Sequence, residues 1–154
     1  MFTLAATLLG GVATGLYAEG IPLKQCPEPV VRTIKSQLGF GRIDEIKTIR
    51  AENRILYLAE IDLPGERERK LHVGDDGTLL RVVEDVRLGD LPRPVKSALQ
   101  PFLAGGNRFD GADRITASGR TEYYVEVDLP DDADLHLVIG EGGEILRRRE
   151  EGDF

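Results

Sequence analysis

Two histidines and the glutamates near them are the residues of this chain whose types could do chemistry. His72 and His136 are the only two histidines in the sequence. Each follows an alternating polar and apolar segment, which predicts a β-hairpin with Glu60 or Glu126 on its first strand. Pairing the apolar columns across each hairpin places Glu60 opposite His72 and Glu126 opposite His136. A carboxylate beside an imidazole can begin a divalent metal site or serve as an acid and base pair.

A structural role explains these pairs more simply than chemistry does. A cross-strand pair of opposite charge contributes about 0.2 to 1 kcal/mol to stability. A zinc site needs three or four donors, and the sequence contains no His-Glu-x-x-His or similar spacing. It also contains no Gly-x-Ser-x-Gly nucleophile motif. We therefore expect no catalytic residue, no cofactor and no bound metal, and we expect that the chain is not an enzyme.

The segments that position the two pairs occur twice in the sequence. Residues 57–64 and 123–130 show the same alternation of polar and apolar residues, 66 positions apart. Matches continue on both sides, through a Pro-x-Pro-Val motif upstream and a glycine-containing turn downstream. Similarity at a fixed spacing indicates an internal duplication. We expect one unit at 27–84 and a second at 91–150.

Each unit predicts one short helix followed by four strands. Apolar residues recur at helical spacing after the Pro-x-Pro motif, although Pro101 should kink or shorten the second helix. The strands are joined by turns too short for parallel crossovers, so the sheets should be antiparallel. The expected fold class is α+β, with two tandem repeats that each pack one helix on a four-stranded antiparallel sheet. Because one helix stripe buries little apolar area, we also expect a shared or contiguous core for the two units.

The alternating strand also predicts which sheet face is free to meet a partner. The columns that begin with Tyr57 and Tyr123 should face the helices, so the residues between them should point the other way. This outward set contains apolar, aromatic and acidic side chains, and it is the candidate partner face: Leu56, Leu58, Tyr124, Glu60 and Glu126. An exposed apolar patch of this kind marks a binding site, whereas the acidic stripe alone is more simply explained as a solvated sheet face.

Charge and the N-terminal segment restrict the partner and the compartment. The chain has 27 acidic residues against 20 Lys and Arg, a net charge of −7, which opposes binding to nucleic acid. Residues 1–18 are uncharged and largely apolar, which predicts a signal peptide or an uncleaved N-terminal anchor. We expect an exported protein, periplasmic or extracellular, with no stable membrane span in the mature chain.

Cys26 is the only cysteine, so a disulfide within the chain is excluded. Two readings remain for its thiol. It is either partly buried at the start of the first helix or available for an intermolecular disulfide after export.

These motifs together resemble the PepSY-like domain family. The resemblance rests on the Pro-x-Pro-Val helix start, on Ile43 and Ile46 in the first long strand, on the Tyr-led strand and on the Asp-Gly-x-Leu-Leu turn. The tandem is also similar in architecture to the secreted beta-lactamase inhibitory protein (BLIP). The resemblance implies an exported noncatalytic binding module that binds a protein partner, inhibiting or regulating a peptidase or another envelope protein. The alternative is a structural, small-ligand-sensing or metal-sensing envelope protein.

Overall fold

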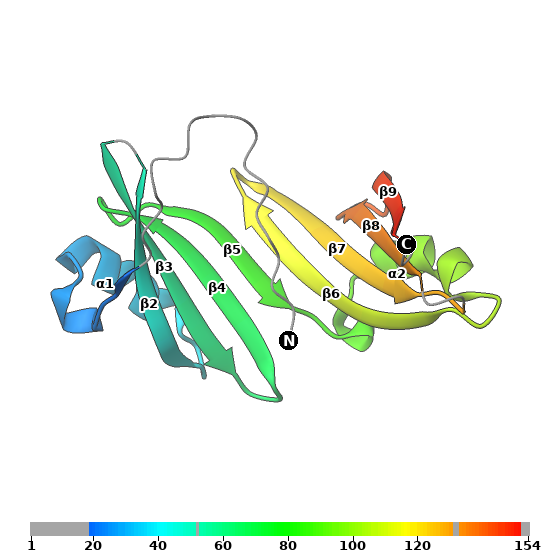
Figure 1. The fold of residues 1–154 in the computed structure, drawn as a ribbon, viewed down its shortest axis with the longest axis horizontal. Coiled ribbons are helices and arrows are strands. Elements are labelled where there is room, and N and C mark those ends of the chain that lie inside the picture. The colour runs from blue at the N-terminus through cyan, green and yellow to red at the C-terminus, as the bar shows by residue number, and fades with distance from the viewer. Residues whose placement is uncertain (1–18, 52, 131–132, 152–154) are drawn as a thin grey trace.

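The strands of the protein form one antiparallel sheet in which each strand pairs with its neighbours in sequence (Figure 1). The computed structural model describes residues 19–151 apart from 52 and 131–132, so the expected signal peptide at 1–18 lies outside the described residues. The strands are β1 (Glu19–Gly20), β2 (Arg42–Ala51), β3 (Arg54–Leu63), β4 (Arg67–Gly74), β5 (Leu79–Asp85), β6 (Arg108–Ala117), β7 (Arg120–Asp128), β8 (Asp134–Gly140) and β9 (Ile145–Glu151). The α-helices are α1 (Glu28–Gln37) and α2 (Arg93–Leu99), and short 3-10 helices span Leu23–Gln25, Leu88–Asp90 and Gln100–Leu103.

The expected fold class, two repeats that each have their own four-stranded sheet, is wrong. β5 pairs antiparallel with β6 along five residues of each strand, from Arg81 opposite Ala117 to Asp85 opposite Asp113. This pairing merges the strands into a single sheet of nine, of which β1 has only two residues. Two separate sheets would have left the outer edges of β5 and β6 with unpaired backbone groups, and the merger satisfies them. The domain division at 27–84 and 91–150 stays a prediction.

Both helices pack on the same face of this sheet. Residues paired across adjacent strands share a face. One row of partners crosses five strands in this way: Ile61, Arg69, Glu84, Arg114 and Tyr123. Ile61 lies in the core beneath α1, and Tyr123 lies in the core beneath α2. The opposite face is covered by neither helix, and we call it the helix-free face.

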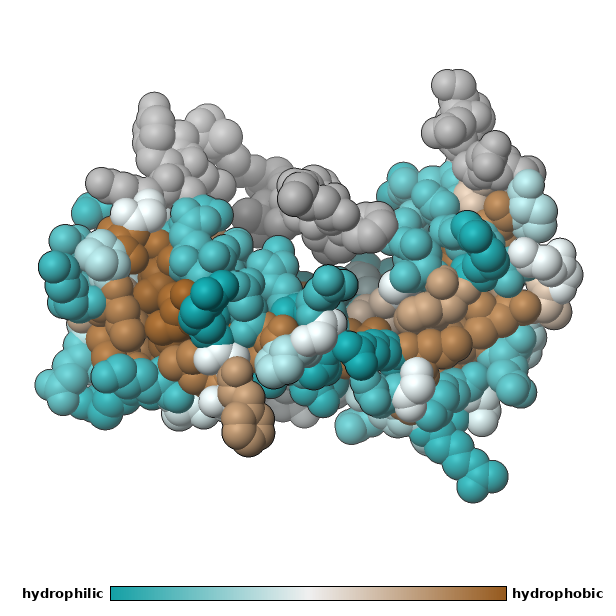
Figure 2. Space-filling view, turned by 90° about the horizontal axis from the view of Figure 1, so that it is seen from below, coloured by the Kyte–Doolittle hydropathy of each residue, from teal (hydrophilic) through white to brown (hydrophobic). Residues whose placement is uncertain are grey.

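The apolar core is divided into two clusters, so the expectation of a shared core is also wrong. In the first half of the molecule (α1 and β1–β5), Val30 and Ile34 of α1 pack on buried residues of β2, β3 and β4. In the second half (α2 and β6–β9), Val95 and Leu99 of α2 pack on β7 and β8. Figure 2 shows two separate hydrophobic regions with hydrophilic residues between them. The sheet backbone, rather than a common core, joins the halves.

Proline and glycine set the ends of the helices and their contact with the hairpin turns. Both α-helices begin after a proline, at Pro27 and Pro92, and α2 gives way to a 3-10 helix around Pro101 as its missing amide predicts. Gly77 has φ +87°, and a Cβ there would lie 2.7 Å from Cβ of Pro29. The β4–β5 turn therefore fits closely against the start of α1. None of the helices in the described part of the chain is long and apolar enough to cross a membrane.

Glu84 holds the junction of β4, β5 and β6 together on the helix-covered face. It is the one charged residue among those described that is buried, with 7% exposed. Its Oε2 atom lies 2.7 Å from Nη2 of Arg69 on β4 and 3.2 Å from Nη2 of Arg114 on β6. The guanidinium of Arg69 also donates a hydrogen bond to the backbone carbonyl of Gln37 at the end of α1. One carboxylate thus connects three strands, and through Arg69 it reaches a helix.

The other side of the same junction carries two aspartates that face each other. Asp85 on β5 lies opposite Asp113 on β6, and the backbone N–H of Glu68 donates to Oδ2 of Asp85 at 2.8 Å. Burial, a hydrogen bond with Asp85 and the negative charge of Asp85 raise the pKa of Asp113 from 3.8 to about 6. Two carboxylates that face each other resist joint ionisation, so Asp113 in its protonated form can donate a hydrogen bond to the Asp85 carboxylate.

Replacement of Glu84 by Ala should lower the free energy of unfolding by about 3 kcal/mol, because Arg69 and Arg114 would lose their shared carboxylate in a partly buried site. Urea denaturation measures the change. Glu28→Ala is the matched control, since Glu28 pairs with Arg32 within α1 at a site where both side chains are largely exposed. An equal, small loss for both variants would contradict the role assigned to Glu84.

Replacement of Asp113 by Asn should stabilise the protein at about pH 7.5 by about 1 kcal/mol. The folded state binds the Asp113 proton more tightly than the unfolded state, so this carboxyl favours folding at acidic pH. That contribution is lost as the pH rises from about 3.8 to about 6. Asn keeps a donor for Asp85 and removes the titration. Urea denaturation of both proteins between about pH 4 and pH 8 measures the difference, and an equal loss of stability in the two would contradict the prediction.

Candidate functional site

The helix-free face collects all five residues of the candidate partner face. They come from the central strands β3 and β7, where they alternate with the buried core residues. All are half-buried: Leu56, Leu58, Glu60, Tyr124 and Glu126. Acidic side chains on this face lead to the aromatic ring. Asp62 lies opposite Glu68, whose backbone N–H donates to Asp85. Asp85 lies opposite Asp113, and Asp113 lies opposite Tyr124. The apolar and aromatic residues of the two halves therefore lie on one surface with carboxylates between them.

The two expected Glu and His pairs have different outcomes in the structure. Glu126 on β7 lies directly opposite His136 on β8. Glu60, however, lies opposite Lys70, and Leu58 lies opposite His72. The expected pairing of Glu60 with His72 is therefore wrong by two residues. The β3–β4 turn closes over three residues, with Gly65 and Glu66 both at positive φ, and this short turn sets the register.

His72 sits in an environment that disfavours its charged form. Burial, together with the positive charge of Arg81, lowers its pKa. Arg81 lies opposite His72 on β5, and Leu58 lies opposite it on β3. His72 is therefore neutral at physiological pH and lies between an aliphatic and a cationic neighbour.

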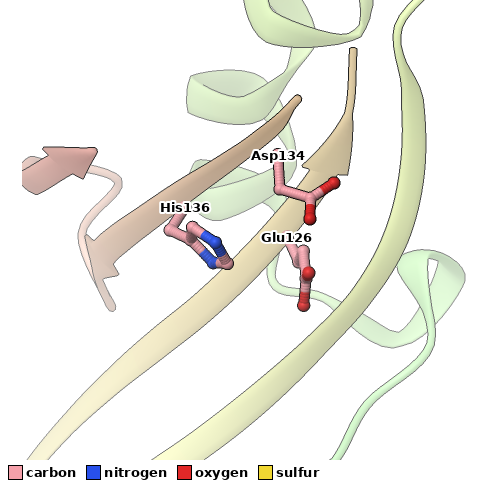
Figure 3. Close-up of side chains that lie close together, drawn as sticks. All are labelled: Glu126, Asp134 and His136. Atoms are coloured by element: carbon pink, nitrogen blue, oxygen red, sulfur yellow. The ribbon is translucent and has the colours of Figure 1, made fainter. Parts of the chain in front are cut away.

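His136 belongs to a cluster of three side chains with metal-binding donor atoms. Glu126, Asp134 and His136 each offer one donor, and these atoms all lie within 4.8 Å of one another. Figure 3 shows the three side chains close together on the helix-free face of β7 and β8. Sequence reasoning missed Asp134, although it stands two residues before His136 on the same strand. The period of two in a β-strand is the signal that places both on one face.

The surroundings of Glu126 are strongly negative. Its pKa is raised, first by burial and then by Asp110, Asp134 and Asp128, while His136 acts in the opposite direction. The Nε2 atom of His136 lies 3.8 Å from a carboxylate oxygen of Glu151 on β9. Two carboxylates and one imidazole are donor types that zinc accepts, so this cluster is the set of described residues that could hold a metal ion.

The equivalent positions in the first half keep both acidic residues but carry a lysine in place of His136. The residues 66 positions before Glu126, Asp134 and His136 are Glu60, Glu68 and Lys70. Lys70 Nζ lies 3.1 Å from a carboxylate oxygen of Glu68. Glu60 is paired with Lys47, at 3.6 Å, and the equivalent of Lys47 in the second half is Asp113. The two halves thus differ in how they balance the same pair of acidic positions.

Cys26 lies in the first core cluster with 8% of its surface exposed. Its Sγ–H points to the backbone carbonyl of Pro22 at 3.9 Å, and burial raises the pKa of the thiol. Of the two readings of this residue, the structure supports the buried thiol at the start of α1.

Comparisons with solved structures find the same fold in bacterial proteins. No protein-family model and no curated protein sequence matches the chain. A proposed periplasmic protein of Bacteroides eggerthii aligns with a TM-score of 0.63 and 15% identity, over 81% of this chain and 88% of that one. A DUF2874 family protein of Bacteroides uniformis aligns with a TM-score of 0.60 and 18% identity, over 81% and 89% of the two chains.

A third similar structure connects this fold with the resemblance stated from the sequence. It is a BLIP-like protein of Bacteroides fragilis, with a TM-score of 0.59 and 18% identity over 83% of this chain and 89% of that one. At these identities the likeness is one of fold. It confirms the BLIP-like architecture, whereas the resemblance to PepSY-like domains stays a prediction.

Proposed function

We propose that the protein is an exported, noncatalytic binding module that holds a protein partner against its helix-free face. The observation that carries the proposal is the position of Leu56, Leu58 and Tyr124. They come from both halves of the chain, yet they share the one sheet face that neither helix packs on. Half-buried apolar and aromatic side chains on such a face supply the contact area that protein partners use.

Charge on the same face selects the kind of partner. Asp85 and Asp113 face each other at its centre, and Glu126 lies among further carboxylates in the second half. The chain as a whole has a net charge of −7. A partner surface with Lys and Arg at its centre and apolar residues on both sides complements this arrangement, and its association should weaken as salt screens the charges.

The similar structures and the N-terminal sequence support an envelope location. One neighbour is a proposed periplasmic protein, and another is described as BLIP-like. Residues 1–18 of this chain have the uncharged, apolar composition of an export signal. In that compartment a peptidase or another envelope enzyme is the kind of partner that the module would inhibit or regulate.

Capture of a partner from a cell-envelope extract tests the proposal. The purified mature protein should retain a specific basic protein at low salt, and Leu58→Glu and Tyr124→Glu should each abolish its capture, because a new charge would be buried in the interface. Raising the salt from about 50 mM to about 500 mM should weaken capture by the unchanged protein.

Phe40→Ser provides the matched control. Phe40 is 99% exposed in the turn between α1 and β2, so its removal deletes an exposed apolar side chain that is not part of the candidate partner face. This variant should capture the partner as well as the unchanged protein does. Equal capture by the Leu58 and Tyr124 variants, or loss of capture in the Phe40 variant alone, would refute the proposed face.

A further inference from the structure

We propose that Glu126, Asp134 and His136 form a binding site for a divalent transition-metal cation of the zinc class. The site lies on the helix-free face of the β7–β8 hairpin (Figure 3). All three ligands come from this chain, so zinc binding needs no partner, although Glu126 also belongs to the candidate partner face.

The geometry of the hairpin brings the three donors together without help from a loop. Glu126 lies directly opposite His136, and Asp134 is two residues away from His136 on the same strand. Their donor atoms already lie within 4.8 Å of one another. Three ligands bonded to one zinc ion at about 2.0 to 2.2 Å would stand roughly 3.4 Å apart. Small rotamer changes in half-buried side chains cover this difference.

In the first half of the sheet, both equivalent acidic positions are paired with lysines. There, Lys70 takes the place of His136, and its ammonium pairs with Glu68, the equivalent of Asp134. Lys47 pairs with Glu60, the equivalent of Glu126. In the second half both lysines are replaced, by His136 and by Asp113. The two lysines are gone, and a metal-binding imidazole stands in the position of one of them. Arg149 lies opposite His136 on β9, where it pairs with Glu151.

The arginines near the cluster have carboxylates of their own. Arg108 pairs with Asp128 at 2.8 Å, and Arg149 pairs with Glu151 at 2.8 Å. Among the described residues, neither Glu126 nor Asp134 forms an ion pair with a lysine or an arginine within 4.0 Å. A bound cation would therefore offset negative charge that this part of the protein leaves without a close partner.

The donor set favours zinc over magnesium or calcium. An imidazole nitrogen is a good ligand for zinc, whereas magnesium and calcium prefer oxygen ligands throughout. Asp134 also lines a hollow of about 380 Å³ bounded by Arg108, Asp128 and Pro130. A water molecule or a further carboxylate can complete the coordination of a metal ion that has three protein ligands.

Isothermal titration of the purified protein, prepared without a polyhistidine tag, with zinc chloride tests the site. We expect one zinc ion per chain with micromolar affinity that millimolar magnesium does not reduce. His136→Lys copies the first half, so its ammonium should pair with the carboxylates and preserve the fold while the zinc affinity falls about tenfold or more. Far-UV circular dichroism and thermal unfolding verify that this variant is folded.

His72→Ala is the control, because His72 is the other histidine and lies outside the cluster. It should bind zinc as the unchanged protein does. Asp134→Asn should weaken zinc binding, because it removes a carboxylate ligand. The equivalent residue in the first half is Glu68. The proposal is overturned if the unchanged protein binds no zinc, if folded His136→Lys binds it equally well, or if His72→Ala removes the binding. Partner capture is tested separately through Leu58 and Tyr124, neither of which belongs to the cluster, so failure of the zinc site and failure of the partner face are distinguishable.

Discussion

The pairing of β5 with β6, with Glu84 at its centre, is the interaction on which the rest of the structure depends. Each half has its own helix and its own apolar cluster, and the two clusters do not merge. Backbone hydrogen bonds across β5 and β6 make the halves one sheet, and the buried Glu84 carboxylate connects arginines from the strands on either side. A polar junction of this kind orients the halves through directed bonds, whereas an apolar junction would hold them by area alone.

A continuous sheet has consequences for both of its faces. It places the two helices on one side and leaves the other side as a single surface that draws residues from both halves. The equivalent positions on that surface have diverged in charge: the first half balances its glutamates with Lys47 and Lys70, and the second has Asp113 and His136 in those places. The two halves thus share their strands and helix, while the described side chains that could hold a metal ion lie in the second half.

Local patterns were enough to predict most of the elements, because strand alternation and proline act over a few residues. The inward columns that begin with Tyr57 and Tyr123 are buried as expected over their first three residues, and α2 ends just before Pro101. The merger of the sheet was missed because β5 and β6 are separated by a helix and carry no local signal of pairing. Glu84 reads in the sequence as one more polar strand residue, and its burial depends on arginines from other strands.

In the candidate site, too, sequence patterns predicted some residue pairs correctly and others wrongly. The register of β7 and β8 follows from their apolar columns, so Glu126 could be placed against His136. The register of β3 and β4 depends on a tight turn at Gly65 and Glu66, and there the expected partner of His72 was two residues away. The ion pairs of Lys47 and Lys70 in the first half could not be predicted, because residue spacing does not give side-chain positions.

Hydrogen exchange of the backbone amides, followed by NMR, tests the continuous sheet most directly. Among the described strands, β3 to β8 have a neighbour on both sides, β1 and β9 are the edges, and β1 covers only two residues of β2. The amides of β5 and β6 should therefore exchange as slowly as those of β3 and β7, through one global opening of the molecule. Exchange in β5 and β6 as fast as in β1 and β9, with slow exchange confined to the interior of each half, would contradict the account.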